Sequence, residues 1–337
     1  MGARSTNPTQ SFIDDFYRSG TDAVTPFTPV PTSASGAFAA WGAGGGGGEE
    51  GCRGGGGGCA IGTLTLDAGN YTFIVGSSGA PHEGSSAGFG GAPARAHNGG
   101  GGGGYSGIFA GDLTPYSFKG YDGSNSQDPS PNRDTAHAAA IMLAGGGGAG
   151  SQEPTANIGG GGGGGTNGDQ APPGQGGGGT QSAGGAGGPG NAFNGSDGGK
   201  LIGGWGADSG GPGSGGGGGG YYGGGSGGAS TGNGVEAAGG GSGYINPPFG
   251  SVTLTTGDPG RNPTSGGAAL PGNPYYPGSA GNGGHGDPNA NVTAGAFVIG
   301  PYSGGSISVT PPGGSPSPVP TSGQAFNTAG KYLLVVS

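Results

Sequence analysis

Short runs of aliphatic and aromatic residues, mixed with threonine and small residues, recur along the chain at lengths typical of β-strands. Turn residues and glycine runs separate them, and helical periodicity is almost absent after residue 35. We expect strands at 37–41, 63–66, 70–75, 138–143, 252–255, 296–299, 306–309 and 332–336. The pattern predicts an all-β fold, a β-sandwich whose loops between strands are expanded.

Residues 1–35 have little glycine and a different pattern. Ser11 and Asp14 have the spacing of a capping box, which starts a helix. Four apolar side chains then fall on one helical face: Phe12, Ile13, Phe16 and Tyr17. The Pro- and Thr-rich segment 25–35 follows in extended form. A short amphipathic helix with an extended arm suits a peptide that docks on a neighbouring subunit, and packing on its own domain suits it equally.

Seven polyglycine runs interrupt the strand pattern, the longest at 159–165, and the chain holds 101 Gly among 337 residues. Runs such as 99–104 and 215–220 can form polyproline-II-type helices, whose N–H and C=O groups point outward and need partners. Ordering costs about 1–2 kcal/mol per residue, while a net hydrogen bond returns about 1 kcal/mol. One run alone would therefore be flexible, whereas several packed runs form a rigid slab. The alternative is flexible linkers, but the short spacing between runs and strands favours the ordered form.

The amino-acid composition narrows the possible classes of protein further. Leu, Ile, Val and Phe account for only 42 of 337 residues, which is typical of a disordered chain. Disordered chains are usually also rich in charge, however, and charged residues make up only 8% here. Glycine comes in blocks, which excludes collagen. The net charge is −9 with no basic cluster, so no nucleic-acid partner is expected. No 18-residue apolar stretch predicts a membrane span, and residues 1–25 lack a secretory signal.

Candidate reactive groups are few. Cys52 and Cys59 flank the run 54–58 and are a disulfide candidate, with free thiols as the alternative. Zinc would need further ligands, which no nearby Cys or His pair supplies, and the four histidines are isolated. A P-loop would need Ser or Thr after the lysine, but Lys200 precedes Leu201. We therefore predict no catalytic, metal or cofactor site and no enzyme activity.

Five aromatic residues lie at or near the ends of glycine segments: Tyr105, Trp205, Tyr221, Tyr222 and Tyr244. One interpretation is that they cap the slab and supply apolar burial. The other is that they form surface-recognition contacts for a host glycan or a protein partner.

The order of motifs adds a resemblance. Trp41-Gly-Ala-Gly-Gly is followed by the strand pair in 62–76, then by Gly99–Gly104 with Tyr105-Ser-Gly-Ile-Phe. Next come Ile141-Met-Leu-Ala before Gly145–Gly148 and Tyr221-Tyr222 after Gly215–Gly220. Gly239-Gly-Gly-Ser-Gly-Tyr-Ile245 completes the series. Over residues 36–256 this resembles the glycine-rich domain of the anaplastic lymphoma kinase and leukocyte tyrosine kinase receptors. Similar domains occur in bacterial and viral surface proteins, and bacteriophage tail-fibre adhesins use polyglycine-II bundles. The resemblance implies a jelly-roll-like sandwich with packed polyglycine-II helices in its inter-strand loops, although the receptor domains have more cysteine.

These observations predict three parts: a docking arm over 1–35, a glycine-rich β/polyglycine-II domain over 36–256, and Pro/Gly-rich coil with closing strands over 257–337. We expect a non-enzymatic virion structural protein, a capsid, vertex or fibre subunit within a larger assembly. Residues 1–35 would contact other virion proteins. The alternatives are a tail-fibre adhesin that binds a host-surface receptor or glycan, and an extracellular ligand-binding or matrix protein.

Overall fold

The computed structural model describes residues 33–48, 52–80, 88–90, 99–120, 131–151, 159–172, 175–207, 213–229, 236–260, 265–284 and 292–337. They belong to one compact unit, Thr32–Ser337. The predicted docking helix and its anchor residues Phe12, Ile13, Phe16 and Tyr17 lie outside the described residues.

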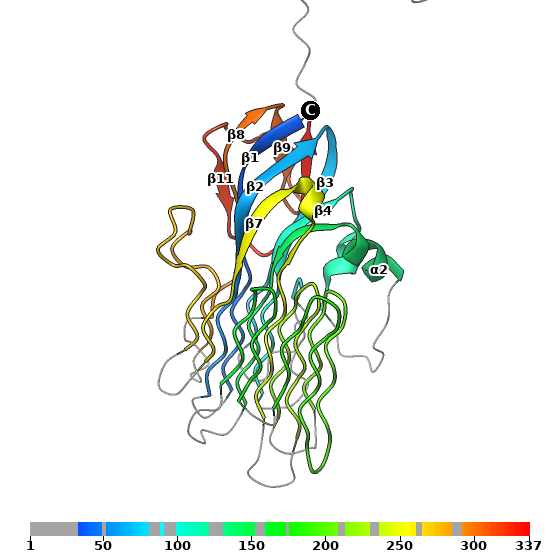
Figure 1. The fold of residues 1–337 in the computed structure, drawn as a ribbon, viewed down its shortest axis with the longest axis vertical. Helices are drawn as coiled ribbons and strands as arrows, with labels where there is room; N and C mark the ends of the chain where they lie inside the picture. Colours follow the sequence, from blue (N-terminus) through cyan, green and yellow to red (C-terminus); the bar gives the residue numbers. More distant parts are fainter. Residues whose placement is uncertain are drawn as a thin grey trace, which may run out of the picture. The chain divides into compact units, whose positions relative to one another are not determined.

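The described part is all-β in its broad class, with two antiparallel sheets (Figure 1). The first sheet has the order β11-β8-β1-β2-β7. Its strands are β1 (Ser33–Trp41), β2 (Cys59–Asp67), β7 (Gly250–Thr255), β8 (Ala296–Gly304) and β11 (Gln324–Phe326). The second sheet has the order β10-β9-β12-β3-β4-β5-β6. Its strands are β3 (Gly69–Val75), β4 (Ser106–Ala110), β5 (Ala140–Ala144), β6 (Tyr244–Ile245), β9 (Ile307–Thr310), β10 (Ser317–Pro318) and β12 (Gly330–Val336).

Both sheets combine distant parts of the sequence. Strand β8 lies between β11 and β1, and β12 lies between β9 and β3. The register places Trp41 of β1 opposite both Cys59 and Ala296. Segment 257–337 therefore supplies interior strands to both sheets.

Side chains from the two sheets share one core. Phe73 of β3 stacks on Tyr332 of β12 at 4.6 Å between ring centroids and on Phe297 of β8, in the other sheet, also at 4.6 Å. Phe38 of β1 joins them at 6.4 Å from Phe297. Since aromatic side chains bury large apolar areas, this cluster concentrates the chain's limited apolar material between the sheets.

One α-helix, α2 (Pro131–Ala138), occurs in the described part, with two 3-10 turns at Pro115–Phe118 and Pro247–Phe249. The sequence predicted a strand that starts at residue 138. In the structure Ala138 ends the helix and the strand, β5, begins at Ala140. Proline opens the helix where a missing N–H costs nothing, and Asp134 lies in its first turn, where an acidic group is favoured. Eight residues are too few for a clear helical period.

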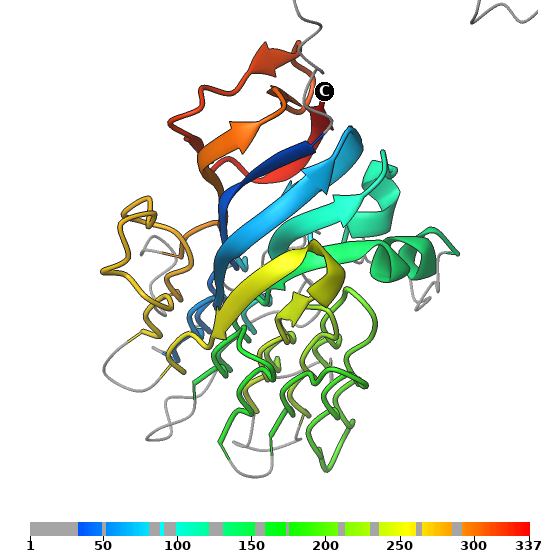
Figure 2. The same cartoon turned by 45° about the horizontal axis from the view of Figure 1, so that its top comes forward.

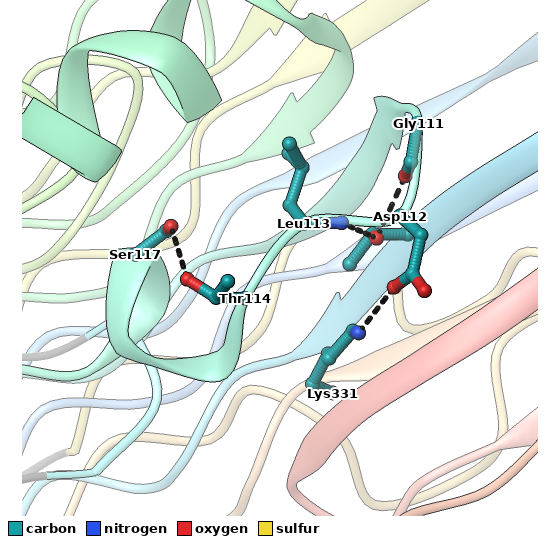
Figure 3. A network of polar contacts seen from close by, with 7 residues as sticks. Gly111, Asp112, Leu113, Thr114, Ser117 and Lys331 are labelled. Carbon is teal, nitrogen blue, oxygen red and sulfur yellow. Dashed lines mark hydrogen bonds and ion pairs between the residues drawn. The ribbon is translucent and has the colours of Figure 1, made fainter.

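A polar network fixes the turn between β4 and α2 (Figure 3). Buried Thr72 of β3 donates its hydroxyl to the carbonyl of Gly111 at 2.8 Å and accepts from the N–H of Leu113 at 2.9 Å. Nearby, Lys331 of β12 contacts Asp112 at 2.6 Å. Two neighbouring strands therefore hold the start of the connection that leads to α2.

Glycine-rich segments continue from the ends of the strands and run beside one another (Figures 1 and 2). We call these hydrogen-bonded segments the glycine layer: 42–48, 52–58, 99–104, 145–150, 159–165, 213–220, 223–229 and 236–243. Their residues are largely buried. The layer is therefore an interior made mostly of backbone.

Hydrogen bonds in the layer repeat every third residue. In segment 42–48, every third N–H donates to segment 52–58: Gly42 to Gly58, Gly45 to Gly55 and Gly48 to Cys52, at 3.0, 2.9 and 3.0 Å. The residues that follow two of these donors, again three apart, donate to segment 99–104 instead. Their N–H groups bond Ala43 to Gly104 and Gly46 to Gly101, both at 2.8 Å. Segment 42–48 thus bonds to two neighbouring segments, and the N–H of Gly44 donates to a third part of the chain, the carbonyl of Thr293, at 3.1 Å.

The spacing of the layer requires glycine. A Cβ added at Gly102 would lie against the carbonyl oxygen of Gly217, and one added at Gly160 against that of Gly148, both well inside 3.0 Å. Real Cβ atoms essentially never come so close to another heavy atom. Any side chain there would push neighbouring backbones apart and break their hydrogen bonds.

Candidate recognition site

Three aromatic rings stack where α2, β6 and the glycine layer meet. Tyr221 lies between His137 at 3.9 Å and Tyr244 at 3.7 Å, with interplanar angles of 18° and 8°. His137 lies in the last turn of α2, Tyr221 directly follows segment 213–220, and Tyr244 belongs to β6. Tyr221 and Tyr244 also pack against a second hydrophobic cluster. Its buried residues are Ile74, Tyr105, Phe109, Phe118, Ala136, Ala140, Leu143 and Leu201.

The ring of Tyr222 is nearly perpendicular to the rings of His137 and Tyr221. Its ring is 5.4 Å from Tyr221 at 88° and 4.9 Å from His137 at 70°. Because His137 and Tyr244 cover both faces of Tyr221, Tyr222 meets the edge of that ring rather than a face. We call His137, Tyr221, Tyr222 and Tyr244 the aromatic cluster.

Backbone contacts hold the cluster in place. Ser242 accepts from the N–H of Tyr222 through Oγ at 3.0 Å, and its own N–H donates to the Tyr222 carbonyl at 2.9 Å. The Ser242 carbonyl accepts from the N–H of Tyr221 at 2.9 Å. Lys200 forms an antiparallel bridge with Tyr222, which puts the two side chains next to each other.

An exposed ion pair lies beside the rings. Lys200 Nζ contacts Asp134 Oδ1 of α2 at 2.8 Å. This hydrogen bond lowers the pKa of Asp134 and raises the pKa of Lys200. Both charges are therefore present and paired at neutral pH.

Two of the stacked rings, His137 and Tyr221, carry no charge at neutral pH. Burial lowers the pKa of His137 to about 4, and the nearby Lys200 ammonium lowers it further than the Asp134 carboxylate restores it. Burial, with the neighbouring Tyr244 hydroxyl as a further cause, raises the pKa of Tyr221 to about 12. The site thus places the uncharged rings of His137 and Tyr221 beside a paired cation and anion.

The other aromatic candidates lie elsewhere. Tyr105 is completely buried in the second hydrophobic cluster, 6.1 Å from Phe109, so its prediction as a surface-recognition residue is wrong. Its backbone follows a glycine run directly into β4, which turns the ring inward. Trp205 is half-buried in segment 203–207 and does not belong to the aromatic cluster. The sequence analysis placed Tyr221, Tyr222 and Tyr244 on one list but missed His137, which it treated as isolated.

The predicted disulfide between Cys52 and Cys59 is also wrong for this structure, since both residues are buried thiols. They lie at opposite ends of residues 52–59: the Cys52 carbonyl accepts from the N–H of Gly48, while Cys59 pairs with Trp41 at the start of β2. Seven extended residues span about 20 Å at roughly 3 Å each, whereas a disulfide needs Cα atoms within about 7 Å. Ser151 donates to the Cys52 sulfur at 3.6 Å. Burial raises the pKa of the Cys59 thiol, which makes it a poor nucleophile.

Polar side chains at the margin of the glycine layer were not anticipated. They accept hydrogen bonds from backbone N–H groups within or next to the glycine segments. Examples are Gly187 to Asp197 at 2.8 Å, Ala237 to Gln175 at 2.8 Å, Ala207 to Ser214 at 2.7 Å and Ser196 to Ser226 at 2.8 Å. The signal was the placement of Ser, Asp and Gln within or next to glycine segments, where buried amides need acceptors.

Among the residues that the structure describes, no group of three or more His, Cys, Asp or Glu side chains is placed to hold a metal ion. The same part of the chain contains no helix long and apolar enough to cross a membrane. No protein-family model matches the sequence, and no curated protein is significantly similar to it.

Proposed function

We propose that the chain is a non-enzymatic structural protein of a virion, a capsid, vertex or fibre subunit. The observation that carries this proposal is the three-residue hydrogen-bond repeat of the glycine layer. A laterally bonded slab resists bending, because moving one segment breaks bonds to several neighbours. A rigid body of this kind suits a mechanical role in a large particle.

The finer architecture belongs to the same proposal. A polyproline-II-type helix has three residues per turn, which accounts for a bonding period of three. In the run 159–165, only Gly164 and Gly165 have φ in the left-handed region. These features support polyglycine-II helices. The aromatic core shared by two antiparallel sheets supports a jelly-roll-like sandwich as the frame from which they extend.

Attachment to other virion proteins is assigned in this proposal to residues 1–35. Their amphipathic pattern supports a docking role. Deleting residues 1–31 should leave the folded unit Thr32–Ser337 intact while removing the chain from particles.

The direct test is quantitative mass spectrometry of purified particles, with gold-labelled antibodies to locate the chain by electron microscopy. Many copies per particle support a shell or fibre-shaft role. A few copies at fibre tips support an adhesin instead. Absence from particles overturns the virion proposal and favours the extracellular alternative.

A second function, recognition of a host surface, is favoured by one observation. Tyr222 is a half-buried aromatic ring that contacts other rings of the cluster without belonging to a hydrophobic core cluster of the described residues. Aromatic rings placed in this way are common in binding surfaces.

A further inference from the structure

Three Asn–Gly pairs occur in the part of the chain that the structure describes: Asn167-Gly168, Asn194-Gly195 and Asn282-Gly283. Asparagine is a thermolabile residue, and a following glycine favours loss of its side-chain amide, because no Cβ hinders the glycine nitrogen. Asn167 and Asn194 are exposed, and Asn282 is half-buried. Burial away from water therefore does not protect the two exposed side chains.

The reaction depends on the backbone nitrogen of the glycine. This nitrogen loses its proton and attacks Cγ of the asparagine, and a cyclic succinimide forms as the Cγ–Nδ2 bond breaks and ammonia leaves. Water then opens the ring to aspartate or to isoaspartate, whose main chain runs through the former side chain. A backbone N–H that is bonded to a fixed carbonyl is held away from this reaction until the local structure opens.

The structure holds the glycine nitrogen of every one of these pairs. Each N–H donates to a carbonyl of a neighbouring segment: Gly168 to Gly179, Gly195 to Gly188 and Gly283 to Gly266, at 2.9, 2.8 and 2.9 Å. Two of the carboxamides are held as well. Asn194 Oδ1 accepts from the N–H of Gly190 at 3.1 Å, and Asn282 Oδ1 accepts from that of Ala268 at 3.3 Å.

The three accepting glycines are in turn bonded to the glycine layer. Their own N–H groups donate to carbonyls of segments 236–243, 223–229 and 52–58: Gly179 to Gly240, Gly188 to Ser226 and Gly266 to Gly54, at 2.9, 2.8 and 3.1 Å. Freeing a glycine nitrogen therefore requires the margin of the layer to open at that place.

We propose that Asn167, Asn194 and Asn282 are latent modification sites, which stay unreactive while the margin of the glycine layer is closed and deamidate where it opens. Isoaspartate lengthens the main chain by one carbon, so a segment that has reacted does not regain its spacing. Each event also adds a negative charge to a chain of net charge −9. The modification thus records an opening irreversibly, and it does not depend on the virion role, which copy number tests.

The first test incubates the full wild-type chain in mildly alkaline buffer, folded and in guanidinium chloride. Peptide mass spectrometry that separates aspartate from isoaspartate gives the rate at each asparagine. We expect all three to react at least about tenfold more slowly in the folded chain, because only opened molecules react.

Two valine substitutions are designed to open one pair each. A Cβ at Gly178 would lie against the carbonyl of Gly168, and one at Gly187 against that of Gly195, both well inside 3.0 Å. Each added side chain therefore displaces the backbone of one Asn–Gly pair.

Gly178→Val should speed deamidation of Asn167 at least about threefold more than that of Asn194, and Gly187→Val should do the reverse. Each variant is thus the control for the other. Gly272→Val, with nothing within 4 Å of the added Cβ, should leave the wild-type rates unchanged.

Equal rates in the folded and denatured wild type overturn the proposal, and so does a folded valine variant that speeds both pairs equally. Thermal melts establish that each variant is folded. If neither variant folds, hydrogen exchange of the wild type decides. Amides of Gly168 and Gly195 that resist exchange while Asn167 and Asn194 deamidate at the denatured rate would show that these hydrogen bonds give no protection.

Discussion

At the scale of single residues, the hydroxyl group of Tyr105 lowers the stability of the fold. Its side chain is completely buried, and its hydroxyl has no hydrogen-bond partner among the residues that the structure describes. An unsatisfied buried hydroxyl costs about 1–3 kcal/mol. We expect Tyr105→Phe to raise the free energy of unfolding by about 1 kcal/mol, since the ring contacts stay and only the unpaired group is lost. Urea unfolding measures the change.

A matched control is Tyr302, whose buried hydroxyl donates to the carbonyl of Val319 at 2.7 Å. Tyr302→Phe should lower the free energy of unfolding by about 1–2 kcal/mol, because it leaves an acceptor unpaired. Destabilisation of the same size in both variants would mean that the Tyr105 hydroxyl is bonded after all.

His137 makes stability depend on pH. Its pKa is about 4 in the folded chain and near 6.5 when unfolded, so the unfolded state binds more protons between these values. The stabilisation is fully present above pH 6.5 and is lost as pH falls toward 4. For a half-buried ring that solvent partly screens, we expect a loss on the order of 1–2 kcal/mol. The groups that face it are Lys200, Asp134 and Tyr221.

The measurement compares wild type with His137→Phe, which keeps an uncharged ring in the stack. Denaturant unfolding at pH 7.5 and pH 4.5 gives the free energy of unfolding for each. The wild type should lose more stability than the variant over this range. Equal losses would show that other groups account for the acid sensitivity.

At the scale of elements, the glycine segments give the sharpest prediction. A Cβ at Gly162 would meet the carbonyl of Gly257, and one at Gly217 the carbonyl of Gly224. Valine at either position should lower the free energy of unfolding by about 3 kcal/mol or more, above the usual 1–3 kcal/mol of overpacking, because backbone cannot rotate away as a side chain does. Thermal or urea unfolding reports the effect.

The control for these variants is Gly272→Val. Gly272 lies exposed in a turn, has nothing within 4 Å of an added Cβ, and is not in the left-handed φ region. We expect a change within about 0.5 kcal/mol, as for ordinary surface substitutions. If valine at Gly162 and Gly217 is tolerated as well as at Gly272, the segments are flexible linkers.

Elements could be predicted where an apolar pattern marks a strand. The expected strands at 37–41, 63–66 and 70–75 lie within β1, β2 and β3, and 332–336 lies within β12. The short helix α2 was missed, because its eight residues are mostly polar and small. Strands such as β6 and β10, two residues each, have no sequence signal at all.

At the scale of the whole molecule, sequence patterns could not reveal which segments meet. Trp41 pairs with Ala296 across most of the chain, and nothing in either strand specifies the partner. The aromatic cluster also forms from segments that are distant in the sequence. His137 and Tyr244 are brought to Tyr221 by β5 pairing with β6 and by Ser242 bonding to the tyrosine backbone. Contacts between distant segments therefore limited the prediction of both fold and site.

The backbone-rich interior of the molecule should also lower its heat capacity of unfolding. Exposing apolar surface raises the heat capacity of unfolding and exposing polar surface lowers it, which gives ordinary proteins about 12–15 cal/mol/K per residue. Here much of the interior is peptide groups of the glycine layer, so more of the surface exposed on unfolding is polar. We expect a value clearly below about 12 cal/mol/K per residue and a correspondingly flatter curve of stability against temperature. Calorimetry at several pH values measures it, and urea unfolding at several temperatures replaces calorimetry if heating is irreversible. An ordinary heat capacity would mean that apolar side chains, rather than backbone pairing, make up most of the surface buried on folding.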